Sequence, residues 1–400
     1  MQRKAYQTIE QADGEGIRTF VIYGLASVGK TTLVLNYVKA AYDKYLYVDA
    51  QFDQGFSSEV SICENKNALT FFSDYFHLEP EYLVNIPIII DEPSEKVLDS
   101  RLFTDYGQEL KLFIIVSDVS RKEKMEKAIK TSPNMKTIQL FPLNFGEFLI
   151  AQDKEWYDEV VVGHTMSKRK LPDMIHEELL DLFDVFRMTG GMPEVVEEYV
   201  KSGNYENIRQ KQIRTASAVI YPVLKRNMAA NKVESVLDAV GDSVDKEGHK
   251  FMYASIRDGA TKKEYDPTID YLCSHDMLFK IPRLNDDRDF RLYLSDIGLY
   301  MGNRTERLES LLLREMRSSG MRISYWESGK GASVGMIVEG TSGTIPIELK
   351  EEKSNARSVK AFLKEFNLSS YIRFCGDNIK VEPDYVSLPY YAAYTLAKIM

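Results

Sequence analysis

The sequence predicts an α/β protein whose first 150 residues form a parallel β-sheet covered by helices. Two observations predict this class. Continuous apolar runs typical of strands buried on both faces lie at Thr19–Tyr23, Tyr45–Asp49, Ile86–Ile90 and Leu112–Val116. Segments with apolar residues at helical spacing lie between them, most clearly at Thr31–Ala41. Strands that alternate with helices in this way are typical of a parallel sheet.

The first strand leads into Gly-x-x-x-x-Gly-Lys-Thr, the pattern of a phosphate-binding loop. Its glycines allow backbone conformations in which successive N–H groups point at phosphate oxygens, and the next helix presents its positive end to the same anion. Lys30 is predicted to reach the β- and γ-phosphates, and the Thr31 hydroxyl to bind Mg²⁺. The candidate nucleotide-binding residues are Gly24, Leu25, Ala26, Ser27, Val28, Gly29, Lys30, Thr31 and Thr32. The alternative is a glycine-rich connector that binds nothing.

Two further strand ends carry polar residues suited to the same chemistry. The run Ile86–Ile90 ends in Asp91 and Glu92, which is the form of a Walker B element. Asp91 is the second candidate metal ligand, and Glu92 is the candidate base that orients or deprotonates water. Ser117, after the next strand, is the candidate contact to the γ-phosphate, although an ordinary strand-capping serine has the same appearance.

Composition limits the remaining function classes. The net charge of -9 over 400 residues argues against a protein that coats nucleic acid. Cys63, Cys273 and Cys375 have no metal-ligand spacing and are expected to be reduced thiols. No apolar run approaches the length of a membrane span, and the first residues lack the apolar region of a signal peptide. We therefore expect a cytoplasmic protein of two to four domains.

The second half of the chain holds two patterns. Helices followed by a hairpin around Asn285–Asp287 suit a winged helix, although no strongly basic recognition helix accompanies them. The strand Ile345–Lys350 places Glu348 and Lys350 on one face, which is the form of the PD-(D/E)xK nucleases.

These motifs occur together in one order: Gly24–Thr32, Ile86–Glu92, Pro142–Leu149, Gly190–Glu194 and Ile345–Lys350. In this the chain resembles bacterial and archaeal AAA+-like P-loop ATPases with a C-terminal uncharacterised domain of PD-(D/E)xK nuclease-like fold. The resemblance implies a P-loop NTPase (AAA+-like) core at residues 1–150 and a helical lid region at 151–225. It further implies a winged-helix-like domain at 226–303 and a small α/β nuclease-like domain at 304–400.

The chain departs from that family at two places. Leu25-Ala26-Ser27-Val28 replaces the family's Arg-Gln-containing loop centre, which removes an arginine but keeps Lys30 and Thr31. Gly335 stands where nuclease-type members have an acidic metal ligand, so the tentative second site is Glu309, Glu348 and Lys350. Glu339 shares the strand face of Gly335 but lies at the turn. One carboxylate holds Mg²⁺ poorly, so we expect no nuclease activity and a surface ion pair between Glu348 and Lys350.

The leading hypothesis is an ATPase that uses ATP and Mg²⁺, with Lys30, Glu92 and Ser117 as its catalytic residues. Hydrolysis is expected to move the helical and winged-helix parts on the core. Its turnover is expected to be slow, because no arginine finger is assignable among Arg187, Arg214 and Arg226, in cis or from a neighbouring copy in an oligomer. The alternatives are a nucleotide-gated module that binds DNA or protein with little turnover, and an ATP-regulated nuclease. GTP is disfavoured because the chain has no clear Asn-Lys-x-Asp motif.

Overall fold

The structure is a computed structural model of the whole chain. It describes residues 3–53, 55–56, 58, 60, 68–98, 110–117, 134–225, 230–243, 251–299, 308–340, 343–350 and 356–400. The chain divides into two compact units. The N-terminal unit contains Gln2–Phe141 and Ser274–Asp276, and the C-terminal unit contains Pro142–Cys273 and Met277–Met400. The finer division expected at residues 225 and 303 stays a prediction.

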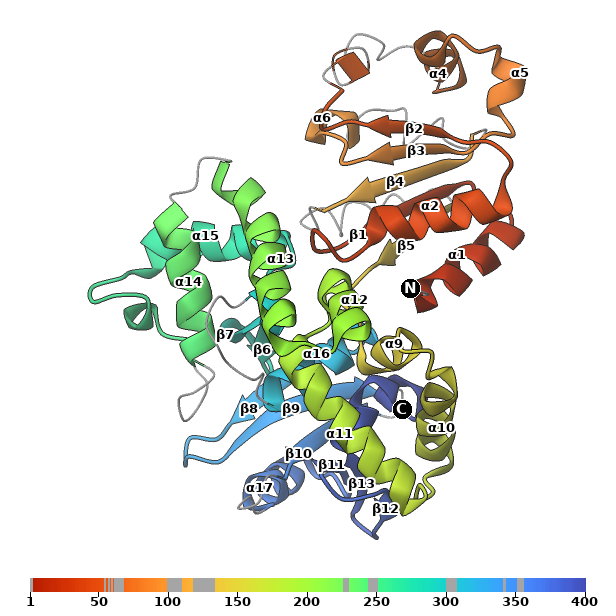
Figure 1. Ribbon diagram of the computed structural model, residues 1–400. Coiled ribbons are helices and arrows are strands. Elements are labelled where there is room, and N and C mark those ends of the chain that lie inside the picture. Colours follow the sequence, from red (N-terminus) through yellow and green to blue (C-terminus); the bar gives the residue numbers. More distant parts are fainter. Residues whose placement is uncertain are drawn as a thin grey trace. The chain divides into compact units, whose positions relative to one another are not determined.

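The N-terminal unit is built on a five-stranded sheet in the order β2-β3-β4-β1-β5, and every adjacent pair is parallel (Figure 1). Its strands are β1 (Thr19–Tyr23), β2 (Leu46–Asp49), β3 (Ile88–Asp91), β4 (Leu112–Val116) and β5 (Met135–Gln139). The parallel sheet predicted from the sequence is confirmed. Pro87 directly precedes β3, where its missing N–H removes no ladder bond, and its carbonyl accepts from the Leu46 N–H at 2.9 Å.

Helices cover both faces of this sheet. On one face Phe20 stacks on Phe113, whose ring also contacts Tyr37 of α2 (Lys30–Ala41). On the other face the apolar side chains of the strands form one buried cluster with Phe71 and Phe72 of α4 (Ala68–Phe76). The unit also contains α1 (Lys4–Gly14), α5 (Pro80–Leu83) and α6 (Glu95–Leu98). Burial on both faces explains why the strands are continuously apolar.

The C-terminal unit begins with helices. They are α9 (Phe145–Ile150), α10 (Glu155–Ser167), α11 (Asp173–Thr189), α12 (Pro193–Ser202), α13 (Tyr205–Lys225), α14 (Ala230–Ser243), η1 (Tyr253–Ser255) and α15 (Lys262–Ser274). The capping box predicted at the start of α9 is confirmed, because the Asn144 side chain accepts from the Glu147 N–H while the Glu147 carboxylate accepts from the Asn144 N–H.

An eight-stranded mixed sheet follows, in the order β12-β13-β11-β10-β9-β8-β6-β7. Its elements are β6 (Leu278–Arg283), β7 (Asp286–Leu294), η2 (Ile297–Leu299), α16 (Leu308–Ser318), β8 (Ile323–Glu327), β9 (Ser333–Gly340), β10 (Gly343–Leu349), α17 (Arg357–Phe366), β11 (Tyr371–Cys375), β12 (Lys380–Val381), β13 (Tyr385–Pro389) and η3 (Tyr390–Lys398). Strand β10 is parallel to β11 and antiparallel to β9. The β6–β7 hairpin joins the sheet at a single position, Arg283 beside Tyr325.

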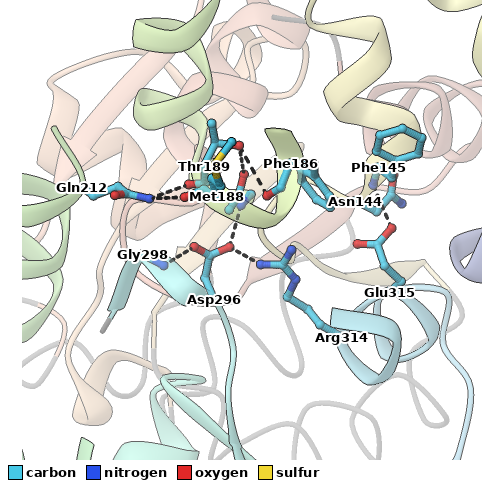
Figure 2. A network of polar contacts seen from close by, with 12 residues as sticks. Asn144, Phe145, Phe186, Met188, Thr189, Gln212, Asp296, Gly298, Arg314 and Glu315 are labelled. Carbon is cyan, nitrogen blue, oxygen red and sulfur yellow. Dashed lines mark hydrogen bonds and ion pairs between the residues drawn. The ribbon is translucent and has the colours of Figure 1, made fainter. Parts of the chain in front are cut away.

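A buried aspartate joins three segments of the C-terminal unit (Figure 2). Asp296 is fully buried and accepts from the Gly191 N–H at 2.6 Å, the Gly298 N–H at 2.8 Å and the Arg314 guanidinium at 2.6 Å. A Cβ on Gly191 would come within 2.3 Å of the Leu143 carbonyl oxygen, so this position excludes any larger residue. The Pro142–Leu149 and Gly190–Glu194 motifs therefore serve packing in this unit.

Within the described ranges, no helix combines the length and the apolar composition that crossing a bilayer requires.

Candidate functional site

The predicted phosphate loop joins β1 to α2 in the N-terminal unit. Gly24 has a φ of 149°, and a Cβ there would lie 2.1 Å from the Leu140 carbonyl oxygen. Gly29 precedes α2 with a φ of 88°, and Ser27 also has a positive φ of 63°. The two glycines of the motif are thus needed for steric and conformational reasons, and the loop ends at the N-terminus of a helix, where an anion is favoured.

Lys30 is folded back onto this loop. Its ammonium donates to the carbonyl oxygens of Gly24 and Leu25, both at 3.0 Å, and to the Ser117 hydroxyl at 2.8 Å. Burial lowers the pKa of Lys30 below its ordinary value, and the nearby carboxylates of Glu92 and Asp91 oppose that shift. A buried cation held by neutral oxygens is suited to exchange them for an anion.

Ser117 joins Lys30 to Glu92. Its hydroxyl donates to one oxygen of the Glu92 carboxylate, and its backbone N–H donates to the other at 3.1 Å. The Lys30 ammonium lies 3.9 Å from the same carboxylate. This arrangement follows from the strand order: β4 lies between β1 and β3, so the residue after β4 stands between the phosphate loop and the end of β3. Glu92 itself has a φ of 49°, a conformation seldom adopted outside glycine.

Thr31 and Asp91 form the second pair of the site. The Thr31 hydroxyl donates to Oδ2 of Asp91 at 2.8 Å, and the hydroxyl of Tyr47 on β2 donates to the same oxygen at 2.8 Å. Two hard oxygen groups beside a phosphate loop fit Mg²⁺, which takes one or two protein ligands and completes its shell with water and phosphate. The residues predicted to hold the metal are therefore adjacent and of the right chemistry.

Sequence reasoning missed two residues of this site. Tyr47 contacts Asp91 across neighbouring strands, and the alternation of β2, which places its side chain on the Asp91 face, was the available signal. Arg3 is buried, and its guanidinium donates to the Val28 carbonyl at 2.8 Å and to the Phe141 carbonyl at 2.7 Å. Arg3 thereby stabilises the predicted phosphate loop, and no sequence pattern near Arg3 predicts this contact.

The tentative second site lies in the C-terminal unit, and one expectation about it is wrong. Glu348 is 6% exposed and is bonded at 2.6 Å to Arg373, its neighbour in register on β11, while Lys350 lies 3.9 Å from Asp377. The expected surface pair of Glu348 with Lys350 does not form. Residues two apart on one strand face stand farther apart than neighbours across the ladder, so the adjacent strand supplies the counter-charge.

Glu309 is also neutralised by an arginine. The buried Arg291 of β7 lies 3.6 Å from Glu309 and 3.0 Å from Glu327, and Tyr293 donates to Glu309 at 3.0 Å. A Cβ on Gly335 would lie 3.0 Å from the Glu309 carboxylate and 3.5 Å from the Arg291 guanidinium. Gly335, where the resemblance led us to look for an acidic metal ligand, therefore lies beside the Arg291 guanidinium.

The remaining acidic and basic candidates have local partners or exposed positions. Glu339 is exposed and lies 3.8 Å from Arg322. Arg187 is bonded at 2.9 Å to Asp184, one helical turn away, and Arg214 is exposed on α13. Arg226 lies outside the described residues. Across the described ranges, no group of three or more His, Cys, Asp or Glu side chains is arranged to hold a metal ion.

Comparison with known proteins defines the class of the N-terminal unit. Residues 17–149 match the family described as AAA domain, and residues 181–306 match a domain of unknown function, DUF8612. No curated protein matches the chain.

Three solved structures are similar to the chain. The Walker-type ATPase Paby2304 of Pyrococcus abyssi is 14% identical with a TM-score of 0.45, covering 74% of this chain and 94% of its own. A Signal Transduction ATPase with Numerous Domains (STAND) protein with a tetratricopeptide repeat sensor from Pyrococcus horikoshii is 14% identical with a TM-score of 0.30, covering 80% of this chain and 45% of its own. Cdc6p from Pyrobaculum aerophilum is 9% identical with a TM-score of 0.26, covering 69% of this chain and 86% of its own.

The match to an AAA domain agrees with the arrangement of the predicted nucleotide site. Residues 17–149 form an AAA-type ATPase-like domain, which contains the parallel five-stranded sheet and the predicted phosphate loop. The AAA-like part of the sequence-based expectation is therefore confirmed. The winged-helix and nuclease-like assignments remain proposals.

Proposed function

We propose that this protein is a Mg²⁺-dependent ATPase with slow basal turnover, in which the nucleotide state governs how the C-terminal segments engage a partner. The observation that carries the proposal is the convergence of Lys30, Ser117, Glu92, Thr31 and Asp91 behind one phosphate loop. These groups come from the ends of β3 and β4 and from the first turn of α2. Such convergence of charged groups is typical of a catalytic site.

Each side chain has a distinct task in this proposal. Lys30 would bind the terminal phosphates, and Thr31 and Asp91 would hold Mg²⁺. The bound metal would neutralise part of the triphosphate charge. Glu92 would accept the proton of the attacking water, and Ser117 would bind the γ-phosphate or that water. Ser117 donates to both oxygens of Glu92 in this structure, and hydrogen bonds to the charged form make the carboxylate a weaker base, which supports slow turnover.

A protein partner is favoured over DNA. The region from α14 to the β6–β7 hairpin has the helix–helix–hairpin order of a winged helix. However, four of its described basic side chains are paired with acidic ones: Lys280 with Asp270, Arg283 with Asp289, Arg288 with Asp286 and Arg257 with Glu264. Phosphate contacts need cations free of carboxylates, since these contacts supply most of the affinity for DNA.

The nuclease alternative is disfavoured by the same kind of evidence. The order α16–β8–β9–β10–α17–β11 supports a nuclease-like fold for residues 304–400. The two candidate carboxylates are paired with arginines, Glu309 with Arg291 and Glu348 with Arg373. Each guanidinium supplies the positive charge that a metal ion would supply in a nuclease. Metal-dependent cleavage of a plasmid that Lys350→Ala abolishes would overturn this conclusion.

The proposal is tested by phosphate release from ATP and by thermal unfolding. Glu92→Gln should lower turnover at least about 100-fold, the usual contribution of a general base. It should keep the rise in unfolding temperature that ATP and Mg²⁺ produce. Lys30→Ala should lose that rise, because the phosphates lose their cation.

Matched controls are Glu81→Gln and Lys39→Ala, the same changes at exposed positions of the same unit. Both should behave as the unmodified protein. Equal phosphate release with and without Glu92→Gln would reject Glu92 as the base. An unfolding temperature that ignores ATP and Mg²⁺ in the unmodified protein would reject nucleotide binding altogether.

A further inference from the structure

The N-terminal unit contains a cavity of about 380 Å³ that takes no part in the proposed catalysis. Its lining residues include Arg18, Asn85 and Lys111, and each precedes a strand: β1, β3 and β4. In a parallel sheet the N-terminal ends of these strands lie on the same side of the sheet. The phosphate loop follows the C-terminal end of β1, on the opposite side. The cavity therefore lies at the N-terminal ends of the strands and the phosphate loop at their C-terminal ends.

One wall of the cavity contains a charge pair and the hydrogen bonds around it. The Lys111 ammonium is buried and forms an ion pair with Asp13, and it also donates to the Ile17 carbonyl at 2.6 Å. The hydroxyls of Tyr37 and Tyr42 donate to the same Asp13 carboxylate. The positive charge of Lys111 and the negative charge of Asp13 thus cancel.

The net charge of the cavity then comes from Arg18. Within the described part of the chain, no carboxylate forms an ion pair with Arg18, and the Asn85 amide forms no hydrogen bond. A partly buried guanidinium beside an exposed amide offers several N–H donors to one acceptor group. The Tyr42 ring and the Val84 side chain supply apolar lining next to these donors.

We propose that this cavity is a second ligand site, which binds a small organic anion through Arg18 and Asn85. The planar guanidinium matches the two oxygens of a carboxylate or a phosphate ester. The cavity volume is near the lower end of the range for ligand pockets and fits a molecule with about one ring. The apolar part of that molecule would lie against Tyr42 and Val84.

The test uses the full chain with Lys30→Ala, so that the phosphate loop does not capture the probes. The probes are benzoate and phenyl phosphate, and benzamide is their neutral counterpart of similar shape. Binding is measured by titration calorimetry. At least one anion should bind about tenfold more tightly than benzamide, and the better of the two identifies the acidic group.

Arg18→Gln should remove that preference for the anion, and Asn85→Ala should weaken it. Lys39→Gln, which deletes one exposed positive charge from the same unit, should change nothing. Thermal unfolding of each variant shows that it is folded, and Asn85→Ala serves alone if Arg18→Gln is not. The inference is overturned if neither anion binds better than benzamide, or if the folded variants bind the anion as the parent does. Neither result bears on ATP turnover, which the unmodified protein reports separately.

Discussion

The hydrogen bond from Tyr47 to Asp91 gives the sharpest test of the metal site. Tyr47→Phe deletes one hydroxyl that donates to Oδ2 of Asp91 at 2.8 Å and leaves the ring in place. A hydrogen bond to a charged acceptor contributes about 1.5–3 kcal/mol. Since the Tyr47 side chain is 39% exposed, water takes over part of that bond, and about 1 kcal/mol is the expected loss.

We expect the lost hydrogen-bond energy to weaken Mg²⁺ binding, because Tyr47 fixes the orientation of a carboxylate that would hold the metal. An energy of about 1 kcal/mol corresponds to roughly a fivefold higher Mg²⁺ concentration at half-maximal activity. The assay is a Mg²⁺ titration of phosphate release at saturating ATP. The maximal rate should change little, since among the described residues no hydrogen bond joins the Tyr47 hydroxyl to Glu92 or Ser117.

Tyr45→Phe is the matched control. It deletes a hydroxyl two residues away on the same stretch of chain, where no hydrogen bond is made within the described residues. If Tyr47→Phe and Tyr45→Phe give the same Mg²⁺ dependence as the unmodified protein, the orienting role of Tyr47 is wrong.

Two predictions concern stability. Asp13→Asn should destabilise the N-terminal unit by about 3 kcal/mol in urea unfolding at neutral pH, because it leaves the buried Lys111 charge without its partner. Burial alone would raise the pKa of Asp13, but the hydrogen bonds from Lys111 and two tyrosines outweigh burial and hold the pKa below 3.8. The contribution of Asp13 to the free energy of unfolding is therefore present above pH 3.8 and is lost as the pH falls through the lowered pKa. The gap between Asp13→Asn and the unmodified protein should therefore close in acid, and a gap that persists would contradict the assignment. Gly191→Ala should destabilise the C-terminal unit by at least about 2 kcal/mol, since its Cβ would meet the Leu143 carbonyl oxygen, whereas Gly163→Ala, in an open helical position, should stabilise by up to about 1 kcal/mol in the same melt.

Much of the N-terminal unit could be predicted from the sequence because the signals are local. The apolar runs define β1, β3 and β4 with small errors at their ends, and the spacing of Gly24, Gly29 and Lys30 places a phosphate loop between β1 and α2. Each of these relations joins residues within one strand, one turn or one helix, where the backbone period fixes geometry. The capping box of Asn144 and Glu147 was predictable for the same reason.

The pairings across elements were decided only by the tertiary structure. Nothing near Arg3 in the sequence indicates that it braces Val28, and the partner of Glu348 is Arg373 rather than Lys350. Strand order and register bring such residues together over long separations, and no spacing rule encodes them.

The sequence by itself thus determined which functional groups the N-terminal unit offers: a glycine-rich loop, a lysine, and carboxylates at strand ends. Only the tertiary structure decided that β4 inserts Ser117 between Lys30 and Glu92, and that arginines neutralise the carboxylates of the C-terminal unit. The physical reason is that a side chain's identity sets what it can bind, whereas its charge partner is whichever group the packed strands place within hydrogen-bond reach.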